Sequence, residues 1–119
     1  MELENILKSF VTNHKNLHAI IYHDKEGIII LKAFDQAITE NIITIDFLNI
    51  FNLSTHQINK IGMGDIKKLL ITLKNYQIIQ FNKDKVILTA IISKNSNMGF
   101  FLNLDEELNE LSSLLQSFV

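Results

Sequence analysis

Apolar residues with helical spacing mark three segments of the chain. In residues 1–13, "MELENILKSFVTN", apolar side chains recur every three or four positions, as on one face of an amphipathic helix. Residues 39–62, "TENIITIDFLNIFNLSTHQINKIG", repeat this spacing and end at Gly62, where a helix commonly stops. A last helix is expected to begin near Ser96 and to continue through "DEELNELSSLL". The pattern predicts a helix at each end of the chain and one near its middle.

Five shorter apolar segments are typical of β-strands. The first two, "LHAIIYHD" and "GIIILKAF", flank the polar turn "KEG" as a hairpin, and "KKLLITLK", "YQIIQF" and "KVILTAIIS" follow the central helix. The element order is α-β-β-α-β-β-β-α. Hairpins and one helical crossover connect these strands, so we expect a five-stranded, mostly antiparallel sheet with the central helix on one face and the terminal helices on the other. The predicted fold class is α/β (α+β), in a single domain over residues 1–119.

Composition adds limits on function. The chain of 119 residues is 47% hydrophobic and 20% charged, which is typical of one folded domain. Its net charge is −2 and it has no basic run, so nucleic acid is not expected as a partner. Without cysteine there is no disulfide and no thiolate metal site. No apolar run reaches the roughly 20 residues of a membrane span, so we expect a cytoplasmic protein without direct membrane insertion.

Candidate chemistry is concentrated in residues 17–31, "LHAIIYHDKEGIIIL", which contain two histidines and two carboxylates. Side chains of a regular strand alternate between faces, so the odd spacing of His18 and His23 is expected to place them on opposite faces. Asp24 and Glu26 fall in the turn, where an aspartate often accepts backbone hydrogen bonds. No converging acid, base and nucleophile, nucleotide loop or zinc spacing is seen. We predict no catalytic, cofactor or metal site.

Two segments are candidates for a protein interface. The strand "KKLLITLK" is expected at a sheet edge, where Lys68, Leu70 and Thr72 would accompany unpaired backbone groups. Its lysines suit an edge protected from pairing, whereas its aliphatic centre suits pairing with a partner strand. On the central helix, one flank mixes leucine, asparagine and threonine beside an aromatic residue: Leu48, Phe51, Asn52, Thr55 and Asn59. This flank fits either a partly polar interface or ordinary exposed residues.

Four strings carry a resemblance that runs in one register through almost the whole chain: "LHAIIYHDKEG", "DFLNIFNLSTHQINKIG", "NYQIIQFN" and "NSNMGFFLNLDEELNEL". With the element order, they make the chain similar to the roadblock/dynein-light-chain superfamily, which has a roadblock/profilin-like fold. Within it, the chain resembles the MAPK-scaffold subunits of Ragulator, the late endosomal/lysosomal adaptor complex.

The resemblance implies a non-enzymatic adaptor that forms a heterodimer with a second roadblock-domain protein, through paired central helices and aligned third strands. It further implies a lipidated Ragulator scaffold subunit, Rag-type GTPases and MAP-kinase pathway kinases as partners, and a role in TOR signalling on late endosomes or lysosomes. It favours the interface interpretation of both candidate segments. The alternative within this fold is a homodimeric roadblock protein that regulates a small GTPase directly.

Overall fold

The computed structural model describes residues 2–35, 67–96 and 98–117. Its strands are β1 (Leu17–His23), β2 (Ile29–Phe34), β3 (Lys68–Thr72), β4 (Tyr76–Lys83) and β5 (Val86–Ser93). Its helices are α1 (Glu2–Asn13), α4 (Met98–Phe101), α5 (Leu104–Glu107) and α6 (Asn109–Gln116). The central helix predicted over residues 39–62 lies outside the described residues.

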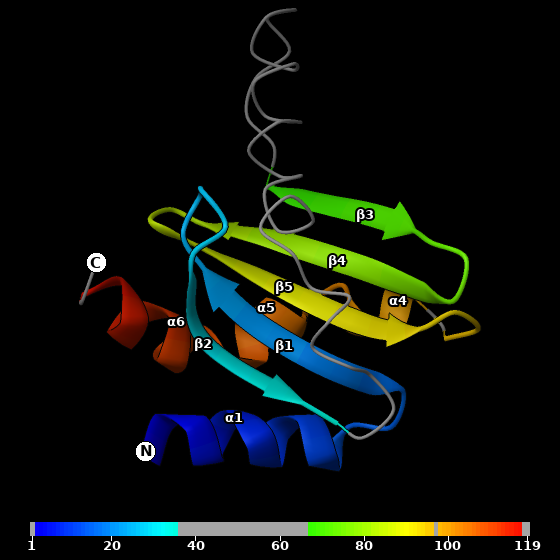
Figure 1. The fold of residues 1–119 in the computed structure, drawn as a ribbon, viewed down its shortest axis with the longest axis horizontal. Coiled ribbons are helices and arrows are strands. Elements are labelled where there is room, and N and C mark those ends of the chain that lie inside the picture. The colour runs from blue at the N-terminus through cyan, green and yellow to red at the C-terminus, as the bar shows by residue number, and fades with distance from the viewer. Residues whose placement is uncertain (1, 36–66, 97, 118–119) are drawn as a thin grey trace, which may run out of the picture.

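The five strands form one sheet in the order β2-β1-β5-β4-β3, and every neighbouring pair is antiparallel (Figure 1). The predicted five strands and the α/β (α+β) class are confirmed. In the described part of the chain, β2 and β3 are the two edges. Because β4 and β5 are a hairpin and β5 pairs with β1, the strands from both halves of the sequence meet at the centre of the sheet.

The β1–β2 hairpin turn is held by the side chain of Asp24. Its Oδ1 accepts hydrogen bonds from the backbone N–H groups of Glu26 and Ile28, both at 2.9 Å. Gly27 has φ 93°, a value that costs a residue without a Cβ little. The expectation that Asp24 binds backbone amides of the turn is confirmed, and Glu26 is exposed.

The larger part of the core lies between one face of the sheet and the terminal helices. Leu7 and Val11 of α1 and Leu104, Leu111 and Leu115 of the C-terminal helices pack there in one cluster with the sheet. The prediction that both terminal helices cover the same face is therefore confirmed. Within the described residues, no helix has the length and apolar character needed to span a membrane.

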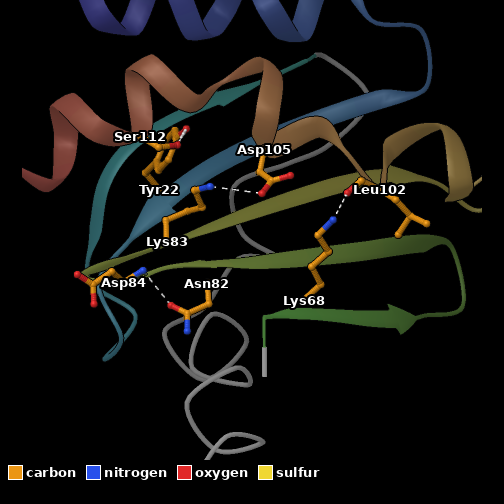
Figure 2. Close-up of polar contacts among 8 residues, drawn as sticks. All are labelled: Tyr22, Lys68, Asn82, Lys83, Asp84, Leu102, Asp105 and Ser112. Carbon is orange, nitrogen blue, oxygen red and sulfur yellow. Dashed lines mark hydrogen bonds and ion pairs between the residues drawn. The ribbon is translucent and has the colours of Figure 1, made fainter. Parts of the chain in front are cut away.

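The C-terminal segment differs from the single helix that we predicted. It starts close to Ser96, at Met98, but is divided into α4, α5 and α6. Asn103 (φ −109°, ψ 19°) and Leu108 (φ −105°, ψ 16°) leave the helical region at the two breaks. At the first break the Leu102 carbonyl accepts a hydrogen bond from Lys68 Nζ of β3 at 2.7 Å, so a tertiary contact replaces a helical one (Figure 2).

The opposite face of the sheet carries a second, smaller cluster of Ala19, Ile21, Ile78 and Ile91, with Phe34, Ile71 and Tyr76 packed against it. All four of its central residues are at most 1% exposed. None of the described helices packs on this face. The prediction that the central helix covers it concerns residues outside the described part.

A β-bulge at the start of β1 overturns the expected placement of the two histidines. Leu17 pairs with Ile92 of β5, yet Ala19 pairs with Ile91, so His18 is an extra residue in the ladder. His18 therefore turns to the face of the second cluster, where its ring meets that of Tyr76 edge-on with centroids 5.9 Å apart. His23 lies on that same face, so the prediction of opposite faces was wrong because it assumed a regular strand.

Candidate functional site: the β3 edge and the polar ends of the sheet

The edge strand β3 is the first candidate interaction surface. Within the described part of the chain it pairs only with β4, from Lys68 opposite Phe81 to Thr72 opposite Gln77. The opposite side of an edge strand carries backbone N–H and C=O groups that a partner strand can use. The expectation that this strand forms a sheet edge is confirmed within the described residues.

Alternation along β3 places the three predicted residues Lys68, Leu70 and Thr72 on the helix-bearing face of the sheet. Leu70 stands opposite Ile79, a member of the larger core cluster, and yet it is 50% exposed. Leu69 and Ile71, between them, point to the second cluster and are partly buried. The centre of this edge therefore exposes a large apolar side chain beside open backbone positions.

Lys68 does not extend away from the edge. Its Nζ donates to the Leu102 carbonyl and lies 5.7 Å from the centroid of the Phe81 ring. Figure 2 shows the side chain directed from β3 toward the C-terminal helices. A lysine protects an edge when its charge projects toward an approaching strand, so this lysine leaves the edge accessible.

The five predicted interface residues of the central helix, Leu48, Phe51, Asn52, Thr55 and Asn59, lie outside the described residues. Their role in a partner interface stays a prediction.

A second constellation was missed by the sequence reasoning. His18 Nδ1 lies 2.6 Å from Asp35 Oδ2, and His18 Nε2 lies 2.6 Å from Ser93 Oγ. An acid, a base and a hydroxyl thus converge where we expected no such group. The signal was weak in the sequence because Ser93 is 75 residues from His18 and because only the bulge turns the ring toward it.

The backbone around this constellation fits a structural contact between strand ends better than acyl transfer. Besides the side-chain bonds, the Asp35 N–H donates to the His18 carbonyl at 2.8 Å. An acyl-transfer site also needs N–H donors directed at a developing oxyanion. Here the Ser93 N–H donates to the Asn16 carbonyl and the Ser96 N–H to the Ser93 carbonyl. The group joins the start of β1, the end of β2 and the end of β5.

His23 belongs to a separate buried network on the same face. Its Nδ1 donates to the Asp24 carbonyl at 2.8 Å, and its Nε2 lies 2.7 Å from Thr89 Oγ1, which also accepts from Gln80 Nε2 at 3.0 Å. The ring is fully buried, and this burial lowers the pKa of His23. A neutral ring satisfies both contacts, with Nε2 accepting from the threonine hydroxyl.

Neither histidine is arranged as a metal ligand. Both ring nitrogens of each have protein partners, and the described residues contain no group of three or more histidine, cysteine or acidic side chains that could hold a metal ion.

Solved structures with the same architecture define the class of protein. A roadblock/LC7 domain from Streptomyces avermitilis matches with a TM-score of 0.70 at 9% identity, covering 97% of this chain and 95% of that one. MglB of Myxococcus xanthus matches with a TM-score of 0.74 at 17% identity, covering 98% of this chain and 97% of that one. The fold is that of a roadblock/LC7 domain.

Sequence relatives identify the family within that class. A family described as "Mitogen-activated protein kinase kinase 1 interacting" matches residues 1–119. The Ragulator complex protein LAMTOR3 of Xenopus tropicalis is 33% identical over 118 residues, which cover 99% of this chain and 95% of that protein. The Bos taurus protein of the same name is 30% identical over the same shares. The chain belongs to the mitogen-activated protein kinase kinase 1 interacting family.

Proposed function

We propose that this chain is a non-catalytic adaptor subunit of a Ragulator-type complex and forms a heterodimer with a second roadblock-domain protein. Support comes from relatives named as Ragulator subunits that match nearly their whole length. The structural observation that supports this proposal most strongly is the edge strand β3, whose central residue Leu70 is half-exposed.

The proposed interface uses β3 as a pairing strand. A partner strand that aligned with Lys68–Thr72 would continue the sheet, supply its backbone hydrogen bonds and bury Leu70. Residues of the central segment would add the rest of the contact, through Leu48, Phe51, Asn52, Thr55 and Asn59. Leu70 and Thr72 are the members of the β3 set best placed to touch the partner, because Lys68 is directed to the helices.

In this proposal the heterodimer binds a lipidated scaffold subunit and thereby resides peripherally on late endosomes or lysosomes. There it serves as a platform for Rag-type GTPases, TOR signalling and MAP-kinase pathway kinases. The family description and the relatives' names support this environment. The bonded backbone around His18 and Ser93 supports the non-catalytic part of the proposal.

The test is co-purification of the tagged full chain from its own cells, with partners identified by mass spectrometry and the mass of the isolated complex measured by light scattering. We expect a 1:1 complex with another roadblock-domain protein. Leu70→Asp should abolish it, since a carboxylate would be buried against the partner. Ile28→Asp, at a similarly exposed residue of the β1–β2 turn, is the matched control and should leave the complex intact.

Two results would contradict the proposal. Retention of the heterodimer by Leu70→Asp would remove β3 from the interface. A stable homodimer of the isolated chain at low concentration would favour the homodimeric regulator of a small GTPase.

A further inference from the structure

A groove lies between α1 and the C-terminal helices. Its volume is about 280 Å³, and its apolar lining comes from Leu3, Ile6 and Phe10 on one side and Leu108, Leu111 and Leu114 on the other. Leu3 and Phe10 pack at its base against the larger core cluster. The groove is therefore continuous with the core and open along the outer surface of the helix layer.

Two large apolar side chains at this groove are exposed to solvent. Ile6 is 49% exposed and Leu114 is 43% exposed, and they are two of only six large hydrophobic residues exposed among those described. One comes from each wall of the groove. Exposed apolar residues that face one another across a groove, instead of standing alone, are typical of a binding surface.

The charged residues that line the groove are all acidic. Glu107 and Glu110 line it, and both are exposed. Residues 98–117 contain no lysine, arginine or histidine, and the acidic Asp105 in this stretch is paired with Lys83 at 3.3 Å. At one end of the groove, His14 Nε2 lies 3.6 Å from Glu107 Oε2.

We propose that this groove binds an amphipathic helix of a partner protein whose apolar stripe is flanked by lysine or arginine. A third helix laid between α1 and α6 would bury Ile6 and Leu114, as helix-in-groove contacts do. Its basic flanks would meet Glu107 and Glu110, and this complementarity selects the partner and its orientation.

The charges argue against two other occupants. A symmetric contact between two copies of this face would bring four glutamates, Glu107 and Glu110 of each copy, into one interface, and residues 98–117 supply no basic side chain to pair with them. An anionic membrane surface would be repelled by the same carboxylates. The basic helix is the occupant whose charge fits.

This surface is separate from the proposed dimer edge. The helix α1 packs near β1 and β2, at the end of the sheet opposite β3 (Figure 1). The proposal that the groove binds a helix is therefore independent of the proposed dimerisation, and an experiment can contradict one proposal without contradicting the other.

The experiment uses three fluorescent helical peptides of about 20 residues with the full chain, and measures binding by anisotropy. The first has leucines at positions i, i+3, i+4 and i+7 with lysines on both flanks. The second has glutamates in place of the lysines, and the third is the first in scrambled order. We expect the lysine-flanked peptide to bind at least about 10-fold more tightly than either control peptide.

Substitutions in the protein then test whether the peptide binds in this groove. Ile6→Gln and Leu114→Gln should each weaken binding of the lysine-flanked peptide at least about 5-fold, and both residues are exposed enough for the chain to stay folded. Glu107→Lys combined with Glu110→Lys should make the glutamate-flanked peptide the better ligand. Ile28→Gln, at a similarly exposed residue of the β1–β2 turn, should change neither affinity.

Equal binding of all three peptides, no binding, or unchanged affinity in the Ile6 and Leu114 variants would overturn the proposal. So would self-association of the chain that Ile6→Gln abolishes, which would assign the groove to a second copy. Binding to phosphatidylserine vesicles that Ile6→Gln abolishes would overturn it in favour of a membrane.

Discussion

His18 Nε2 lies 2.6 Å from Ser93 Oγ and joins the bulged start of β1 to the end of β5. The same ring reaches Asp35 after the end of β2, so one side chain ties together three strand ends. Histidine is a residue type that often suggests catalysis, and here its contacts connect the ends of three strands.

This contact predicts a measurable loss of stability in Ser93→Ala. Removal of a partly buried hydrogen bond costs about 1 kcal/mol of the free energy of unfolding. Urea unfolding monitored by circular dichroism measures it. Ser113→Ala, at an exposed serine of α6, is the control and should stay within about 0.5 kcal/mol of the wild type. Equal stability of the two variants would show that the His18–Ser93 contact contributes nothing.

Burial of His23 predicts that stability falls in mild acid. Its pKa is lowered in the folded chain, so below about pH 6.5 the unfolded state takes up a proton that the folded state does not. The free energy of unfolding should then decrease as pH falls, by at most about 1.4 kcal/mol per pH unit from this group. Urea titrations between pH 7.5 and 5.5 measure the slope.

The control for His23 is His23→Gln, whose side chain can still donate to one neighbour and accept from another but does not titrate. We expect this variant to be less stable at pH 7.5 and to show a shallower decline toward pH 5.5. An unchanged slope would assign the acid sensitivity to other groups.

Tyr22 gives a second pH-dependent prediction, with the opposite sign. Its hydroxyl is buried against Ser112 Oγ at 2.7 Å, and burial raises its pKa to about 12 (Figure 2). Between pH 10 and 12 the unfolded state loses this proton first, so stability should fall as pH rises. Absorbance titration of tyrosinate, compared between wild type and Tyr22→Phe, isolates the group. Ionisation of Tyr22 near pH 10 in the folded protein would contradict its placement in the core.

Lys68 predicts a coupling between β3 and the break in the C-terminal helices. Lys68→Met removes the charged Nζ, and with it the bond to the Leu102 carbonyl and the contact over the Phe81 ring, at a cost of about 0.5–1 kcal/mol. Lys74→Met, an exposed lysine beyond the end of the strand, is the matched control. Thermal unfolding should separate the two. Equal melting temperatures would mean that the break does not depend on this bond.

The strands and their succession along the chain could be predicted from the sequence because alternation and turn chemistry are local. Asp24 and Gly27 specify the first turn, and the apolar segments that follow are long enough to be buried. The bulge at His18 could not be predicted, since it arises from the register of β1 against a strand about 70 residues away. The contact with Ser93 depends on that register and was missed with it.

The two breaks in the C-terminal helical segment likewise could not be predicted from the local sequence. The apolar spacing of residues 98–117 is helical throughout, yet Leu102 gives its carbonyl to a lysine of β3. Of the predicted interface set, Leu70 was expected on an edge strand, because its segment has only one neighbouring strand in the chain with which to form a hairpin, and the structure places it on the edge strand β3. Lys68 is directed to the Leu102 carbonyl at this break, a contact between distant segments that the spacing of apolar residues does not reveal.

Amide hydrogen exchange of the two sheet edges tests most directly whether this chain is a roadblock adaptor that pairs through β3. The measurement compares the isolated chain with its complex with the co-purified roadblock partner, followed by peptide mass spectrometry. We expect exchange over Lys68–Thr72 to slow at least about 10-fold in the complex, while exchange over Ile29–Phe34 of the other edge is unchanged. Unchanged exchange in β3, or protection of β2 instead, would contradict the account.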